Sequence, residues 1–166
     1  MTTIKEDLQA SAAWIVAYFG SDRILLDYSI DSFRSIDIFF DQRAANGRTS
    51  QDIDEILFSL GAYVGETILK NVQGSFWIIE DNGPQEKMGA AIKLPNGKTI
   101  RPIQKVNDRF QKAAGDGIYT FGATILKEIS RDRYWNQVKN SFYNKTRIPG
   151  GSKWRFGQNN KLSGSL

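Results

Sequence analysis

The chain has 166 residues and a formal net charge of +4, and it contains neither cysteine nor histidine. This length predicts one domain with a sizeable core. The two missing residue types exclude disulfides, Cys–His and Ser–His–Asp catalysis, and the usual Cys/His zinc sites. No apolar run approaches the roughly 20 residues that span a bilayer, and the first residues are polar and acidic. We therefore expect a cytoplasmic protein without membrane contact, metal or cofactor.

Charge is distributed unevenly along the chain. Residues 131–166 carry eight Lys/Arg against the single Asp132, a balance of +7, whereas residues 1–130 carry 14 basic and 17 acidic side chains. Glycine, serine and asparagine dominate the last ten residues. The pattern predicts a single domain over residues 1–130, followed by a basic, aromatic-containing and partly mobile extension over residues 131–166.

Three helices are predicted in the first 70 residues. Apolar spacings of three and four predict one helix over residues 3–19 and another from the N-cap Asp31 to about residue 45. A third is predicted from Ser50 to about residue 70, and only a narrow stripe of it, including Glu66 and Lys70, is clearly polar. A helix with so little polar surface is expected at the centre of the domain.

Three strands and two further helices are predicted next. The pattern typical of strands occurs at residues 75–80, 88–94 and 98–101. A typical hairpin turn, Pro95-Asn96-Gly97, separates the last two. Residues 103–114 have helical periodicity, and a last helix follows Asp116 as its cap, with no clear periodicity beyond Arg131. The order predicts an α+β fold in which helices pack on one face of a small antiparallel three-stranded meander.

The central helix contains two glycines four residues apart, Gly61 and Gly65. A glycine inside a helix costs roughly 0.5–1 kcal/mol relative to alanine, so the pair needs a local reason. Both fall on the second apolar face of the helix. We therefore expect another element, either the sheet or a neighbouring helix, to cross close to the backbone there.

An ordered set of motifs carries a resemblance to other proteins. It consists of Leu60-Gly61-Ala62-Tyr63-Val64-Gly65-Glu66, Trp77, Leu94-Pro95-Asn96-Gly97, and Pro102 with Val106. Over about residues 50–115 the chain resembles a group of small uncharacterised bacterial domains with this order of helix, tryptophan-bearing strand, hairpin and proline-led helix. The resemblance implies a small bacterial cytoplasmic α+β domain and brings no activity or catalytic residue with it.

Three carboxylates are candidates for chemistry. If the second and third helices pack side by side, Asp37, Asp41 and Glu66 form a cluster suited to Mg²⁺ and to a carboxylate-dependent hydrolase of phosphate esters or glycosides. The preferred alternative is an acidic helix edge for the two aspartates. For Glu66, it is a solvated pair with Lys70 one turn later.

The extension is the second candidate, because it interleaves cations with aromatic side chains. Cations hold phosphates and aromatic rings stack on bases, which is typical of single-stranded nucleic-acid binding. The alternative is that the aromatics dock back onto the domain, since Tyr134, Trp135 and Val138 have helical spacing and can continue the core. The candidate residues for nucleic-acid binding are Lys139, Lys145, Arg147, Lys153, Trp154 and Arg155.

The leading functional hypothesis is a non-catalytic domain that binds another protein, for example a regulatory or toxin-neutralising partner, because no catalytic set is assembled in the sequence. Single-stranded nucleic-acid binding through the extension is the first alternative, and the carboxylate-dependent hydrolase is the second. Oligomeric state and the identity of the partner are left open by the sequence.

Overall fold

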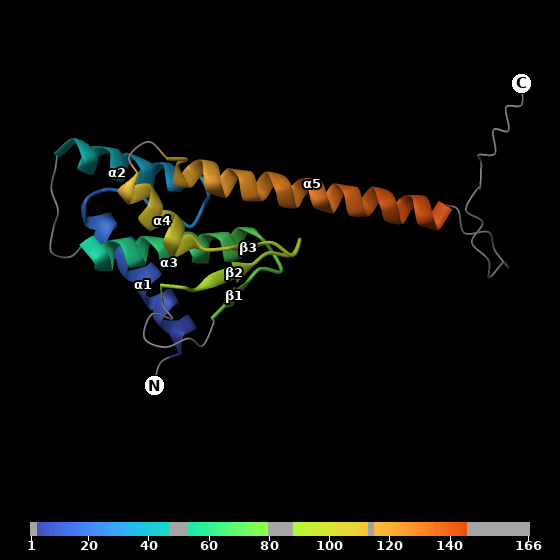
Figure 1. Ribbon diagram of the computed structural model, residues 1–166, viewed down its shortest axis with the longest axis horizontal. Helices are drawn as coiled ribbons and strands as arrows, with labels where there is room; N and C mark the ends of the chain where they lie inside the picture. Colours follow the sequence, from blue (N-terminus) through green and yellow to red (C-terminus); the bar gives the residue numbers. More distant parts are fainter. Residues whose placement is uncertain (1–2, 47–52, 80–87, 113–114, 146–166) are drawn as a thin grey trace, which may run out of the picture. The chain divides into compact units, whose positions relative to one another are not determined.

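The computed structural model describes residues 3–46, 53–79, 88–112 and 115–145 (Figure 1). They fall into two units, Met1–Asp132 and Arg133–Leu166. The described helices and strands are α1 (Ile4–Ser21), α2 (Phe33–Asn46), α3 (Ile53–Asn71), β1 (Phe76–Ile78), β2 (Ala91–Lys93), β3 (Thr99–Ile100), α4 (Pro102–Gln111) and α5 (Ile118–Lys145). Helices with a three-stranded antiparallel sheet confirm the predicted α+β class.

Helix α1 begins with a capping box. Thr3 Oγ1 accepts from the Glu6 backbone N–H at 3.3 Å, and Glu6 Oε2 accepts from the Thr3 backbone N–H at 2.6 Å. Two otherwise unpaired backbone donors are satisfied in this way. The apolar spacing that predicts this helix starts at Ile4, which is partly buried, and continues through Leu8, Ala12 and Ile15, which are buried.

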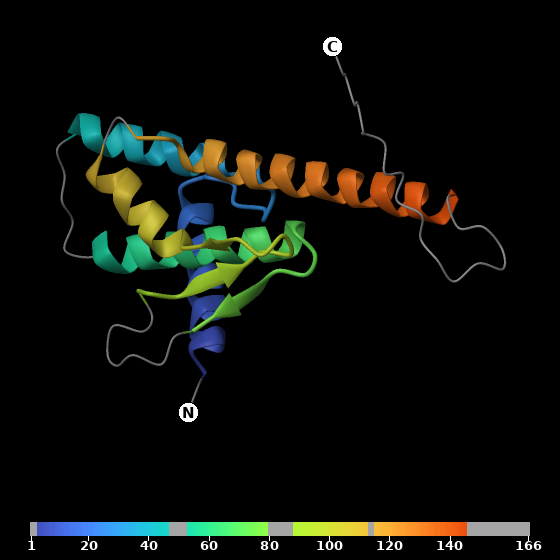
Figure 2. The ribbon, with the colours of Figure 1, turned by 45° about the vertical axis from the view of Figure 1, so that its right-hand side comes forward.

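Helix α3 is the centre of the first unit, as its apolar circumference predicts. Every residue from Ser59 to Ile68 is buried. Figure 2 shows α1 crossing α3, with α4 and the sheet against α3. The α1–α3 and α3–α4 pairs share the most extensive helix contacts. Contact with several neighbours explains why α3 has almost no polar surface.

The sheet has the order β1-β2-β3, with both pairs antiparallel. Trp77 of β1 pairs with Ile92, which pairs in turn with Ile100 of β3. The strands are shorter than predicted, with two or three residues each. The predicted hairpin turn is confirmed: Leu94 N–H donates to the Lys98 carbonyl at 2.8 Å, and Gly97 adopts φ +87°. A left-handed conformation of this kind favours glycine.

Helix α4 starts at Pro102, where the missing proline N–H is not needed. Helix α5 continues to Lys145, well beyond the point at which the sequence periodicity fades. Residues 131–145 contain no glycine or proline, so nothing in the backbone chemistry ends the helix earlier. On the face of α5 that contains the buried Ile125 and Ile129, the next residues at helical spacing are the polar Asp132 and Asn136. The apolar periodicity therefore ends although the helix continues.

None of the helices in the described part of the chain is both long enough and apolar enough to span a membrane.

Candidate functional site

The hydroxyl of Tyr63, in the glycine-containing segment of α3, fixes the loop between α1 and α2. Tyr63 is fully buried, and its Oη accepts from the Tyr28 backbone N–H at 2.9 Å and lies 2.6 Å from Ser32 Oγ. Tyr28 adopts φ +60°, which is rare for a residue with a side chain. Its carbonyl accepts from Asn71 Nδ2 at 2.9 Å, so two α3 side chains hold the strained residue. Burial also raises the pKa of the Tyr63 hydroxyl.

Glu66 is tied to the sheet. Its Oε1 accepts from Trp77 Nε1 at 2.8 Å, and the residue is only 8% exposed. The predicted solvated pair with Lys70 is therefore wrong. Instead, the Lys70 ammonium lies 3.7 Å from the ring centroid of Tyr28. Periodicity assigned Glu66 to the polar stripe of the helix but gave no sign that Trp77 binds and buries it.

Both glycines of α3 allow close approach, as expected, and each faces a different element. A Cβ at Gly61 would lie 2.6 Å from the Cα of Ile103 at the start of α4. A Cβ at Gly65 would overlap the indole ring of Trp77 in β1. The predicted crossing thus involves both a helix and the sheet, and the segment from Gly61 to Glu66 joins α4, the sheet and the α1–α2 loop to one helix.

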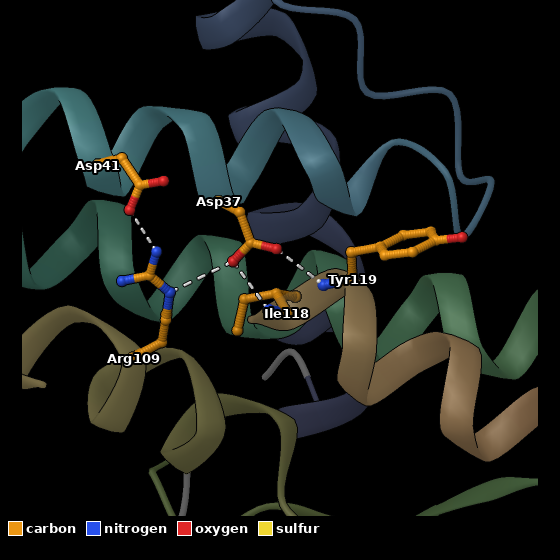
Figure 3. A network of polar contacts seen from close by, with 5 residues as sticks. All are labelled: Asp37, Asp41, Arg109, Ile118 and Tyr119. Atoms are coloured by element: carbon orange, nitrogen blue, oxygen red, sulfur yellow. Dashed lines mark hydrogen bonds and ion pairs between the residues drawn. The ribbon is translucent and has the colours of Figure 1, made fainter. Parts of the chain in front are cut away.

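A network of polar contacts joins α2, α4 and the start of α5 (Figure 3). Arg109 of α4 is 7% exposed, and its Nη2 donates to Asp41 Oδ1 at 2.5 Å. Its Nε lies 3.4 Å from Asp37 Oδ1. Asp37 also accepts from the backbone N–H groups of Ile118 at 2.8 Å and Tyr119 at 3.0 Å. One carboxylate therefore caps α5 and neutralises a buried guanidinium.

The sequence predicted Asp116 as the cap of this helix, whereas the carboxylate on its first N–H groups is that of Asp37, 81 residues before Ile118. Gly117 makes the approach possible, because a Cβ there would lie 2.7 Å from Asp37 Oδ2. The role of Arg109 was also missed. A signal was present: Arg109 follows the buried Ile103 and Val106 at spacings of three, and a cation on a buried face needs a carboxylate.

The turn between β2 and β3 contacts α5 further along. Asn96 Nδ2 donates to Asp132 Oδ2 at 3.2 Å, and Lys98 Nζ donates to Glu128 Oε2 at 2.7 Å. The hairpin turn thus holds the last part of α5 that belongs to the first unit. Nothing in the turn sequence itself indicates this contact.

The structure brings together two of the three candidate carboxylates. Asp37 and Asp41 meet at Arg109, whereas Glu66 binds Trp77. No group of three or more His, Cys, Asp or Glu side chains suited to a metal ion occurs within residues 3–46, 53–79, 88–112 and 115–145. A positively charged partner between the aspartates explains their proximity, so no observation favours the hydrolase hypothesis.

The extension begins as a helix with exposed aromatics. Tyr134 is 65% and Trp135 60% exposed on this helix. The alternative in which they continue the core stays a prediction. Lys139 is also exposed on this helix, and Lys145 ends it. The remaining candidates lie outside the described residues: Arg147, Lys153, Trp154 and Arg155.

A second pair of exposed aromatics lies on α1. The rings of Trp14 and Tyr18 stack with centroids 5.2 Å apart, and the residues are 38% and 42% exposed. Each ring covers part of the other, so this pair offers less free apolar surface than Tyr134 and Trp135.

Comparison with known proteins adds no family to this description. No family model matches the chain, and no curated protein or solved structure matches it either. The resemblance over residues 50–115 therefore stays a prediction.

Proposed function

We propose that this protein is a non-catalytic protein-interaction domain that contacts its partner through the part of α5 beyond Asp132. The observation that supports this most directly is the exposure of Tyr134 and Trp135 on a regular helix. Large aromatic side chains are enriched at protein interfaces because they bury much apolar area with little loss of side-chain entropy. A regulatory or toxin-neutralising role fits such a domain.

The first unit supports the proposal in a different way. Its conspicuous polar side chains are engaged in holding the fold: Tyr63 and Asn71 bind the Tyr28 backbone, Glu66 binds Trp77, and Arg109 joins Asp37 and Asp41. Each of these contacts has a structural role, so none of them calls for a catalytic function to explain it.

The test uses the full chain as bait in a lysate of its native host, followed by purification of the captured protein and isothermal titration. We expect a stoichiometric complex that Trp135→Ala weakens at least about tenfold. Trp14→Ala is the matched control, since Trp14 is also an exposed tryptophan on a helix, and it should leave the affinity unchanged. Equal binding by wild type and Trp135→Ala, or no stoichiometric complex, would count against the proposal.

Binding of single-stranded nucleic acid is the second candidate function. It is favoured by charge, because residues 133–166 contain seven Lys/Arg and no Asp or Glu. Affinity for an oligonucleotide should then fall steeply with salt as counterions are released, and it should vanish on truncation after Ser130. Binding that is absent or independent of salt would remove this candidate.

A further inference from the structure

The exposed aromatics of α5 form one surface with a third apolar side chain. Tyr134, Trp135 and Val138 occupy positions i, i+1 and i+4 of the helix, and we call them the α5 stripe. At about 100° per residue, Val138 lies between the two aromatics around the helix axis. Val138 is half-buried while its two neighbours are exposed. The stripe is therefore a short apolar ridge with an aliphatic centre.

The surroundings of the α5 stripe are cationic. Arg133 precedes it, Lys139 follows it, and both are in the described helix. No Asp or Glu occurs from residue 133 to residue 166, and the one acid of residues 131–166, Asp132, accepts a hydrogen bond from Asn96. The same charge on each copy opposes pairing of two stripes with one another. An occupant of this surface must therefore supply apolar area and negative charge together.

We propose that the α5 stripe binds an acidic amphipathic helix of the partner protein, an inference that rests on the function proposed above. Apolar side chains of such a helix pack against Trp135 and Val138, since residues three and four apart form a ridge that fits the groove of a second helix. Its carboxylates pair with Arg133 and Lys139. A nucleic acid fits less well, because Val138 offers a base no aromatic surface for stacking.

The direct test is fluorescence anisotropy with labelled peptides and the full chain. The probe is a helical peptide of about 20 residues with leucine at the a and d positions and glutamate and alanine elsewhere. One control peptide has the same composition with its leucines in a single block, and another has lysine in place of glutamate. An oligothymidylate of about 20 nucleotides reports on the competing nucleic-acid function.

We expect the acidic amphipathic peptide to bind, and its Kd to rise when NaCl is raised from about 50 to about 300 mM. Trp135→Ala should raise the Kd at least about tenfold, and Trp14→Ala should change it less than about twofold. Equal binding of either control peptide overturns the inference. So does tighter, Trp135-dependent binding of the oligothymidylate, or a Trp135-dependent dimer in analytical ultracentrifugation.

Binding of the native partner distinguishes failure of this inference from failure of the proposed protein-interaction function. If the acidic peptide fails while the native partner still forms a Trp135-dependent complex, the acidic-helix inference falls and the protein-interaction function stands. If Trp135→Ala leaves the Kd of the native complex unchanged, both the acidic-helix inference and the proposed role of α5 in protein binding are wrong. Circular dichroism of Trp135→Ala should match wild type, which excludes unfolding as the cause of any loss.

Discussion

Helices α3 and α5 use aromatic and polar side chains in opposite ways. In α3, the Tyr63 hydroxyl bonds to Ser32 and the Tyr28 backbone, and Glu66 binds a tryptophan. In α5 beyond Asp132, Tyr134 and Trp135 face solvent. The most distinctive sequence motif therefore builds the domain, while the surface that we propose for a partner lies in a segment without any motif. The unusual spacing of the two glycines in α3 coincides with the closest packing of other elements against that helix.

Trp77 and Trp135 illustrate the difference between the interior of the first unit and the exposed part of α5. The ring of Trp77 lies against Gly65 and its Nε1 donates to Glu66, so both its apolar and its polar parts are used inside the fold. Trp135 is 60% exposed. Substitutions around Trp77 should therefore change stability, whereas substitutions at Trp135 should change binding.

The largest effect is expected at Gly65. Gly65→Ala places a Cβ where the indole of Trp77 lies, so it should lower the free energy of unfolding by about 1–3 kcal/mol through overpacking. Urea unfolding followed by circular dichroism measures this. Gly20→Ala is the matched control, since Gly20 is also helical and a Cβ there meets nothing within 4 Å. It should be neutral or stabilising by up to about 1 kcal/mol.

A double variant sharpens the same comparison. The atoms that a Cβ at Gly65 would meet first are Cζ2 and Cη2 of Trp77. Phenylalanine has a smaller ring, so Gly65→Ala should cost less in a Trp77→Phe background than in wild type. Strict additivity of the two changes would mean that the clash is not with this ring.

The next effect concerns the attachment of α5. Asp37→Ala removes the acceptor of two backbone N–H groups and one partner of Arg109, so it should destabilise the fold by about 1–2 kcal/mol. Asp31→Ala is the control: α2 begins at Phe33, so Asp31 is not its N-cap as predicted, and its exposed carboxylate forms a 3.7 Å pair with Arg34. It should change stability by less than about 0.5 kcal/mol. Similar losses for both variants would contradict the capping role of Asp37.

Glu66 gives a smaller effect that depends on the substituting residue. Glu66→Leu leaves the half-buried Trp77 Nε1 without its acceptor and should lower stability by about 1 kcal/mol. Glu66→Gln retains an acceptor oxygen and should stay within about 0.5 kcal/mol of wild type. Chemical denaturation of the two variants in parallel measures the difference. If both are equally destabilised, the charge of Glu66 matters more than its hydrogen bond.

Sequence reasoning predicted what depends on local chemistry and missed what depends on long-range contacts. The class of fold, the buried stripe of α1, the central position of α3 and the close approach at Gly61 follow from periodicity and composition. The partner of Glu66 and the cap of α5 do not, because Trp77 and Asp37 lie 11 and 81 residues away from the groups they bind. Periodicity assigns a residue to a face, and only tertiary packing decides what covers that face.

The smallest stability effect is expected at Trp135. Since its side chain is 60% exposed, Trp135→Ala should change the free energy of unfolding by less than about 0.5 kcal/mol. Thermal and urea unfolding of this variant beside Trp77→Ala, which should be markedly destabilised, measure the contrast. A loss above about 1 kcal/mol at Trp135 would show that its ring packs on the protein. In that case the α5 stripe is core surface and is not available to a partner.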